Sequence, residues 1–135
     1  MSAASVKPRV LVVDDSATVR LWMEAQLREW YDVSSARDGE EAITVALVER
    51  PDLILLDVEM PRVDGFAACR ALRAFAVMRR TPIVMVTSRT EPADVEAGFT
   101  SGCTDFIGKP VDVTELYEKV ASWIAASAVP DDVTS

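Results

Sequence analysis

Three short segments of the sequence are apolar at every position. They are VLVV (10–13), LILL (53–56) and IVMV (83–86). A strand covered on one face alternates apolar and polar residues, whereas a continuous apolar run is typical of a strand buried on both faces, as in a parallel sheet. Two weaker runs, DVSSA (32–36) and DFIG (105–108), predict strands nearer the edges of the same sheet.

A helical pattern follows each of these strands. The predicted helices cover about residues 16–30, 38 onward, 65–75, 91–101 and 112 onward. Asp38 with Glu41, and Asp112 with Glu115, have the spacing of a capping box, in which side chains and backbone donors at the start of a helix satisfy each other. Gly102 follows the fourth helix, where a helix commonly ends in a glycine.

Strand and helix therefore alternate five times along the chain. This alternation predicts an α/β fold: a parallel five-stranded sheet with right-handed crossovers, doubly wound with helices on both faces as a three-layer sandwich. With 135 residues, the chain is expected to form one domain. We assign this domain to residues 9–127, with flexible tails at 1–8 and 128–135.

Charge and composition exclude several classes of function. The net charge of −8 argues against direct binding to nucleic acid or to an anionic membrane. The chain has no histidine, so it cannot use Ser-His or Cys-His catalysis or a histidine-ligated metal. Cys69 and Cys103 form no CxxC pair and are predicted to be core residues. Because the N-terminus lacks a signal-peptide pattern and no apolar run reaches transmembrane length, we expect a cytoplasmic protein without membrane insertion.

Polar residues directly follow four of the predicted strands. In chain order they are Asp14, Asp15, Asp57, Thr87, Ser88 and Lys109. Asp57 is the most unusual of them, because it ends an apolar strand and burying a lone carboxylate is costly. The carboxyl ends of parallel strands meet at one edge of a sheet, where ligands bind at the topological switch point. We therefore expect these side chains to share one pocket.

Each side chain in this pocket has a chemical use. Three carboxylates repel one another, so a proton or a cation has to accompany them, and carboxylates with carbonyls and waters suit Mg²⁺. The Lys109 ammonium can neutralise a phosphoryl oxygen, and the Thr87 hydroxyl can donate a hydrogen bond. Phosphoryl transfer needs these groups, and a carboxylate beside the metal, such as Asp57, can act as the nucleophile and form an aspartyl phosphate.

Taken one at a time, most of these residues have simpler explanations. Asp14 and Asp15 alone could be a helix N-cap and a solvated turn. Thr87 alone could be a turn residue, and Lys109 a surface lysine. Asp57 is the hardest to explain in this way, given its apolar neighbours. Their occurrence together at four strand ends favours a shared site.

Four motifs, VLVVDDS, LILLDVEMPRVDGF, IVMVTS and GCTDFIGKP, have the order and spacing of the receiver domain of bacterial two-component response regulators. The chain resembles this family from about Arg9 to Ala126, and it is similar to the single-domain chemotaxis type. The resemblance implies a flavodoxin-like fold with strand order 2-1-3-4-5. It implies a phosphoprotein of phosphorelay signal transduction.

The resemblance also assigns roles to the acidic residues. Asp57 resembles the phosphoacceptor, which takes its phosphoryl group from the phosphohistidine of a sensor histidine kinase or a phosphotransfer protein. Asp15 resembles a direct ligand of Mg²⁺, for which Mn²⁺ can substitute, and Asp14 resembles a ligand that acts largely through water. The backbone carbonyl of Glu59 is implied as a further ligand.

The remaining positions of the motifs are implied to carry the response. Thr87 and Lys109 are expected to contact the phosphoryl group, and the Lys109–Pro110 peptide bond is expected to be cis. Phe106 falls at the position of the switch aromatic. Phosphorylation is then expected to move Thr87, rotate Phe106 inward and reshape the face made by the fourth helix, fifth strand and fifth helix, where an unidentified protein target binds.

Several residues differ from what is common in this family. Phe106 lacks the hydroxyl of the tyrosine found in many relatives, so burial alone has to drive its inward state. Glu59 and Arg89, with Ser88 beside them, are predicted to tune the lifetime of the phosphate. Glu59 and Arg89 either pair across the mouth of the pocket or stay independently solvated. Gly98, inside the fourth helix, is either a source of mobility or an accommodation to packing.

The leading interpretation is a phosphorylation-controlled interaction module, as a monomer or a phosphorylation-dependent dimer. It is expected to show Mg²⁺-dependent self-phosphorylation and autodephosphorylation without turnover of a separate substrate. One alternative is the amino-terminal piece of a longer regulator with a DNA-binding or enzymatic output domain. Another is a phosphatase with an aspartate nucleophile, for which Glu59 has the expected offset from Asp57 but Asp57 stands too late in the chain.

Overall fold

The computed structural model describes residues 6–128. Of the two predicted tails, residues 1–5 and 129–135 lie outside the described residues, and residues 6–8 and 128 lie within them. In the described part, no helix has the length and apolar character needed to cross a membrane.

Within residues 6–128, five strands and five α-helices alternate, as predicted. They are β1 (Arg9–Val13), α1 (Ala17–Leu27), β2 (Asp32–Ala36), α2 (Gly39–Glu49), β3 (Leu53–Leu56), α3 (Gly65–Arg73), the short 3₁₀ helix η2 (Ala76–Met78), β4 (Ile83–Thr87), α4 (Pro92–Ser101), β5 (Asp105–Gly108) and α5 (Val113–Ser127). All four neighbouring strand pairs are parallel, and the strand order is β2-β1-β3-β4-β5. The predicted fold class and strand order are confirmed.

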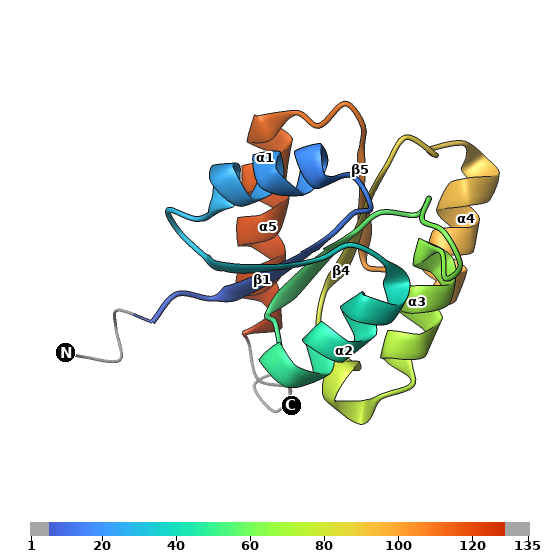
Figure 1. Cartoon of the computed structure of the whole chain (residues 1–135), viewed down its shortest axis with the longest axis horizontal. Helices are drawn as coiled ribbons and strands as arrows, with labels where there is room; N and C mark the ends of the chain where they lie inside the picture. Colours follow the sequence, from blue (N-terminus) through green and yellow to red (C-terminus); the bar gives the residue numbers. More distant parts are fainter. Residues whose placement is uncertain (1–5, 129–135) are drawn as a thin grey trace.

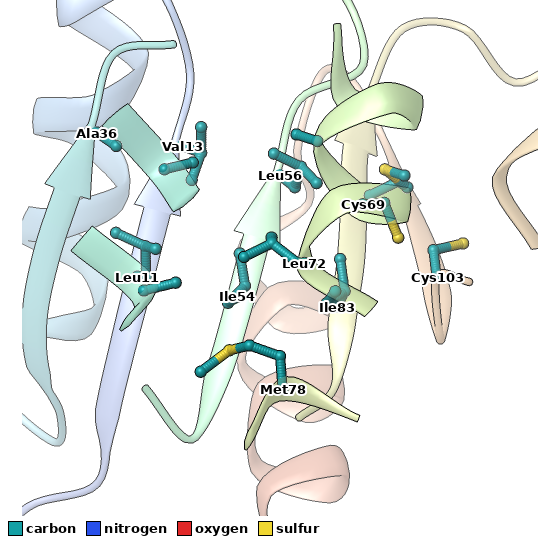
Figure 2. Packing of buried hydrophobic residues seen from close by; sticks show 14 of the residues in the cluster. Leu11, Val13, Ala36, Ile54, Leu56, Cys69, Leu72, Met78, Ile83 and Cys103 are labelled. Atoms are coloured by element: carbon teal, nitrogen blue, oxygen red, sulfur yellow. The ribbon is translucent and has the colours of Figure 1, made fainter. Parts of the chain in front are cut away.

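The sheet is buried on both faces, which explains the fully apolar strands. Figure 1 shows α1 and α5 on one face and α2, α3 and α4 on the other. Alternate residues of β3 point to the two sides: Leu53 and Leu55 pack in the cluster that includes residues of α1 and α5. Ile54 and Leu56 pack in the cluster that includes residues of α2 and α3, part of which Figure 2 shows.

The two cysteines belong to this second cluster. Cys69 on α3 and Cys103 just before β5 are both buried and free, and Figure 2 shows them among apolar side chains. Burial raises the pKa of both thiols, that of Cys103 to about 12. The prediction that they are core residues is confirmed.

The helix ends follow the sequence signals, with four corrections. Asp38 Oδ1 accepts a hydrogen bond from the Glu41 backbone N–H at 2.8 Å, but the Glu41 carboxylate returns to the N–H of Arg37 at 2.7 Å, one residue earlier than a capping box requires. At the start of α5, the Glu115 carboxylate does not complete the capping box predicted with Asp112 but lies 3.3 Å from the Lys119 ammonium. α1 and α3 end at residues 27 and 73, before the predicted 30 and 75.

Gly102 ends α4, as predicted, and its backbone is in the left-handed conformation, with φ 109°. A half-buried contact from α3 holds this end of the helix: Arg73 Nε donates to the Gly102 carbonyl at 2.8 Å. Arg73 Nη1 also donates to the carbonyls of Met78 and Thr81, each at 2.6 Å. Arg73 therefore ties the C-terminal end of α4 to the segment between α3 and β4, and burial lowers its pKa.

Candidate functional site

The carboxyl ends of the strands bring the predicted acidic residues together. Asp14 and Asp15 follow β1, and Asp57 follows β3, its neighbour in the sheet. One carboxylate oxygen from each of the three residues lies within 4.8 Å of the other two. The acidic cluster predicted from the sequence is therefore present.

The backbone around the cluster is fixed by the sheet. The Asp57 N–H donates to the Val13 carbonyl at 3.0 Å, and the Asp14 N–H donates to the Ala36 carbonyl at 3.2 Å. Gly65, at the start of α3, packs directly against the Asp57 backbone, where a Cβ atom would clash with the Asp57 carbonyl oxygen. The main chain that carries Asp57 is thus held by β1 on one side and by α3 on the other.

Lys109 supplies the cation of the pocket. Its Nζ lies 2.8 Å from Asp14 Oδ2 and 3.4 Å from Asp57 Oδ2. Burial lowers the pKa of Lys109, but the hydrogen bond to Asp14 and the charges of both carboxylates outweigh it and raise the pKa. The Lys109 backbone N–H donates to the Thr87 carbonyl at 3.0 Å, and the Lys109–Pro110 peptide bond is cis. Lys109 is therefore a positive charge directed at two of the three carboxylates.

Asp57 is the carboxylate with the most perturbed environment. It is only 5% exposed. Burial raises the pKa of Asp57 to about 6, the Asp14 charge adds to the rise, and Lys109 and the Glu59 N–H oppose it. The Glu59 N–H donates to Asp57 Oδ1 at 3.3 Å.

The donor set tests whether a metal fits here. The Lys109 ammonium pairs with Asp14 and Asp57, and three carboxylates outnumber this one ammonium. The pKa of Asp57 remains raised in spite of Lys109, so the pocket still favours a further positive charge. Clustered carboxylate oxygens are the ligands that Mg²⁺ prefers. The residues present therefore suit a divalent cation of this kind.

Thr87 and Phe106 come from the neighbouring strands β4 and β5. Thr87 is fully buried at the end of β4, and its Oγ1 accepts a hydrogen bond from the Arg89 N–H at 3.1 Å. Phe106 on β5 is half-buried and packs against the core cluster beneath α3. Its ring meets the Phe99 ring of α4 edge to face, with 5.5 Å between the ring centroids.

The Phe106 ring also explains Gly98. A Cβ atom on Gly98 would clash with the Cζ of Phe106, and it would lie 2.7 Å from Cε1 of the same ring. The Cys103 sulfur would lie 3.2 Å from it. Of the two explanations left open by the sequence, this contact supports an accommodation to packing.

The sequence left open whether Glu59 and Arg89 pair across the mouth of the pocket or stay independently solvated, and the structure shows each of them with another partner. Arg89 Nη2 instead lies 2.8 Å from Asp94 Oδ1 in the first turn of α4, and its guanidinium carbon lies 5.8 Å from the centroid of the Phe66 ring. Glu59 Oε1 accepts a hydrogen bond from the Ser88 hydroxyl at 3.4 Å. Arg89 pairs with Asp94 because the start of α4 places this carboxylate beside the loop that carries the arginine.

Two neighbours of the site were missed in the sequence. Asp94 is one, and the only signal for it is its position in the first turn of a predicted helix. Arg20 on α1 is the other: its Nη1 donates to the Asp14 carbonyl at 2.7 Å. Arg20 stands one turn after Ser16, whose hydroxyl caps α1 by accepting from the Val19 N–H. Residues four apart lie on the same face of a helix, so the helical period could have indicated that Arg20 lies on the side of Asp14.

Comparison with known proteins places the chain among signalling proteins. A family model described as the response regulator receiver domain matches residues 10–121. Response regulator PleD of Caulobacter vibrioides is 43% identical over 127 residues, which are 93% of this chain and 28% of that protein. DNA-binding response regulator MtrA of Mycobacterium tuberculosis is 40% identical over 117 residues, 86% of this chain and 50% of that protein. The chain thus spans half or less of the length of these two relatives.

Solved structures agree with these matches. Chemotaxis protein CheY4 of Vibrio cholerae has a TM-score of 0.83 at 34% identity and covers 87% of this chain and 98% of its own. The receiver domain of a sensor histidine kinase of Pseudomonas aeruginosa has a TM-score of 0.83 at 33% identity, over 89% of this chain and 99% of its own. That structure holds a magnesium ion in its active-site cleft.

Proposed function

The chain belongs to the response regulator receiver domain family, whose members are phosphoacceptor signalling modules, and from this premise we propose that Asp57 accepts a phosphoryl group from the phosphohistidine of a partner protein. The donor is a sensor histidine kinase or a phosphotransfer protein. The observation that carries the proposal is the contact of a buried carboxylate with both an acidic neighbour and a lysine: Asp57 lies in the Asp14–Asp15 cluster, 3.4 Å from Lys109 Nζ.

In the proposed reaction, an Asp57 carboxylate oxygen attacks the phosphorus atom. The P–O bond to Asp57 forms as the P–N bond to the donor histidine breaks, and the electron pair of that bond returns to the imidazole. Asp57 has to be ionised to attack, and a pKa of about 6 leaves it mostly ionised at neutral pH. Lys109, already directed at Asp57, neutralises an oxygen of the transferred group.

Asp14, Asp15, Asp57 and the Glu59 carbonyl are the groups that would hold Mg²⁺, with Mn²⁺ as a substitute. When bound, the cation offsets the negative charge that builds up on the phosphoryl oxygens. The magnesium ion in the related kinase receiver domain supports this assignment. The raised pKa of Asp57 supports it from this chain's own residues, because burial and Asp14 already disfavour an unpartnered negative charge there.

The response to phosphate is proposed to pass through Thr87 and Phe106. Phosphorylation adds about −1.5 to −2 charges, toward which the Thr87 hydroxyl moves. Phe106 then shifts into the space that Thr87 leaves, and the face formed by α4, β5 and α5 changes shape. The ring contacts of Phe106 with Phe99 and Gly98 of α4 support this coupling, because a shift of the ring has to alter the packing of α4.

The downstream target is proposed to be a protein that binds the α4-β5-α5 face, in a cytoplasmic phosphorelay. We propose no direct contact of this domain with nucleic acid and no turnover of a separate substrate. The oligomeric state is proposed to be a monomer or a phosphorylation-dependent dimer. Since the chain covers 28% of PleD and 50% of MtrA, an additional output domain in a longer regulator is the second candidate arrangement.

Transfer from a phosphorylated histidine kinase tests the proposal. With Mg²⁺ present, the label should pass from the kinase histidine to this chain, and the Asp57→Asn variant should receive none. Hydrolysis of p-nitrophenyl phosphate should stay at the level of the buffer, which separates a phosphoacceptor from a phosphatase with an aspartate nucleophile. Sustained hydrolysis that depends on Asp57 would support the phosphatase alternative instead.

A further inference from the structure

Arg89 joins three elements beside the site. Its backbone N–H donates to Thr87 Oγ1 at the end of β4. Its guanidinium pairs with Asp94 at the start of α4 and lies over the Phe66 ring of α3. One residue of the β4–α4 loop therefore connects the buried Thr87 hydroxyl to two helices.

Asp94 is the fixed half of the ion pair. Its side chain is 14% exposed, against 45% for Arg89, and its backbone N–H donates to the Glu91 carbonyl at 2.9 Å. A carboxylate in the first turn is also stabilised by the helix dipole. Asp94 of α4 therefore positions the Arg89 side chain. Through that side chain it also restrains the Arg89 backbone N–H that contacts Thr87.

This arrangement restrains Thr87. In the proposed function, the Thr87 hydroxyl moves toward the phosphoryl group on Asp57. That movement has to break the hydrogen bond from the Arg89 N–H or carry Arg89 with it. Either course disturbs the contact of Arg89 with Asp94, because the loop between β4 and α4 is only four residues long.

We propose that Asp94 and Arg89 form a latch that positions the Thr87 hydroxyl in the unphosphorylated state and slows phosphorylation of Asp57. Asp94 acts through Arg89, and Arg89 acts through Thr87, so both are positioning residues. The latch rests on the proposed phosphoacceptor function and adds a control on it. It also takes the place of a pairing of Glu59 with Arg89, since Arg89 acts through Asp94 of α4.

The size of the effect follows from the exposure of the pair. Half-exposed ion pairs change an equilibrium by a factor of up to about five. Breaking the latch should therefore raise the rate of phosphorylation by about two- to fivefold. Salt screens such pairs, so the wild-type rate should rise with ionic strength relative to a variant that lacks the latch.

The test measures the rate at which the whole chain is phosphorylated by acetyl phosphate with Mg²⁺. Asp94→Asn and Arg89→Ala should each be faster than wild type, and the double variant should be no faster than the faster single one. Glu96→Gln, which removes the same charge from an exposed position of the same helix, is the matched control and should match wild type.

Arg89→Ala separates the latch from simple attraction of the anionic donor. If Arg89 only attracts the donor, its loss slows the reaction, whereas loss of a latch speeds it. A slower Arg89→Ala variant, or an Asp94→Asn variant equal to Glu96→Gln, would overturn the latch while the wild type still becomes phosphorylated. Failure of the wild type to be phosphorylated would instead contradict the proposed function itself.

Discussion

Replacing Gly98 with alanine tests the contact between α4 and Phe106. The added Cβ would clash with the Phe106 ring, and it would lie 2.7 Å from Cε1, closer than two carbons can approach. Because Gly98 is in the middle of α4 and its backbone is fixed by the helix, the ring has to move. Phe106 is half-buried, so its ring can move only by losing contacts with the core and with Phe99.

Two opposing terms set the magnitude. Overpacking a core usually costs about 1–3 kcal/mol. Alanine in place of glycine inside a helix contributes about 1 kcal/mol in the other direction. Gly98→Ala should therefore lower the free energy of unfolding by about 1 kcal/mol. In a Phe106→Ala background the overpacking disappears, and of the three atoms nearest to the new Cβ the Cys103 sulfur at 3.2 Å remains. The same substitution should there be neutral or stabilising by up to about 1 kcal/mol.

Urea denaturation of the four proteins of this double-mutant cycle gives the answer. The Gly98→Ala effect should pass from destabilising in the wild type to neutral or stabilising in the Phe106→Ala background, a difference that helix propensity alone cannot produce. Equal effects in the two backgrounds would refute the argument that Gly98 exists to admit the Phe106 ring. Such a result would restore mobility of α4 as the explanation for the glycine.

Three further predictions concern single groups. A carboxyl whose pKa rises to about 6 on folding destabilises the fold as pH increases from about 4 to 6. In EDTA at pH 7.5, the free energy of unfolding of Asp57→Asn should thus be on the order of 2 kcal/mol higher than that of the wild type. Urea denaturation should show that this difference disappears near pH 4. Arg73→Met leaves three half-buried carbonyls without this donor and should lower the free energy of unfolding by about 2 kcal/mol; the exposed Arg70→Met is its control, and equal denaturation midpoints would contradict the role of Arg73. Cys69 and Cys103, buried and with raised pKa values, should resist iodoacetamide at pH 8 until urea is added, as mass spectrometry can measure.

The sequence was sufficient to predict the sheet and the place of the site. Runs such as LILL are apolar at every position because β3 is covered by helices on both sides. Once the strands are known to be parallel, their carboxyl ends must share an edge of the sheet. The strand order, which the family resemblance implied, then places Asp14 and Asp57 on adjacent strands.

The errors concern the partners of side chains on loops and at helix starts, and the residues at which two helices end. Whether Arg89 reaches Glu59 or Asp94 depends on how the β4–α4 loop turns, and the spacing of residues does not specify this. In the same way, Glu115 could have closed a capping box, but Lys119 stands one helical turn away and offers a charge. Competing partners of similar energy make such contacts hard to predict from sequence.

Intact-mass spectrometry after incubation with acetyl phosphate tests the central claim most directly. In Mg²⁺, the wild type should gain the mass of one phosphoryl group, and EDTA should prevent the gain. Asp57→Asn should gain nothing, whereas Asp52→Asn, which removes an acid at the opposite end of the same strand, should behave as wild type. A phosphoryl adduct that persists in Asp57→Asn, or one that forms equally in EDTA, would contradict the assignment of Asp57 as the phosphoacceptor.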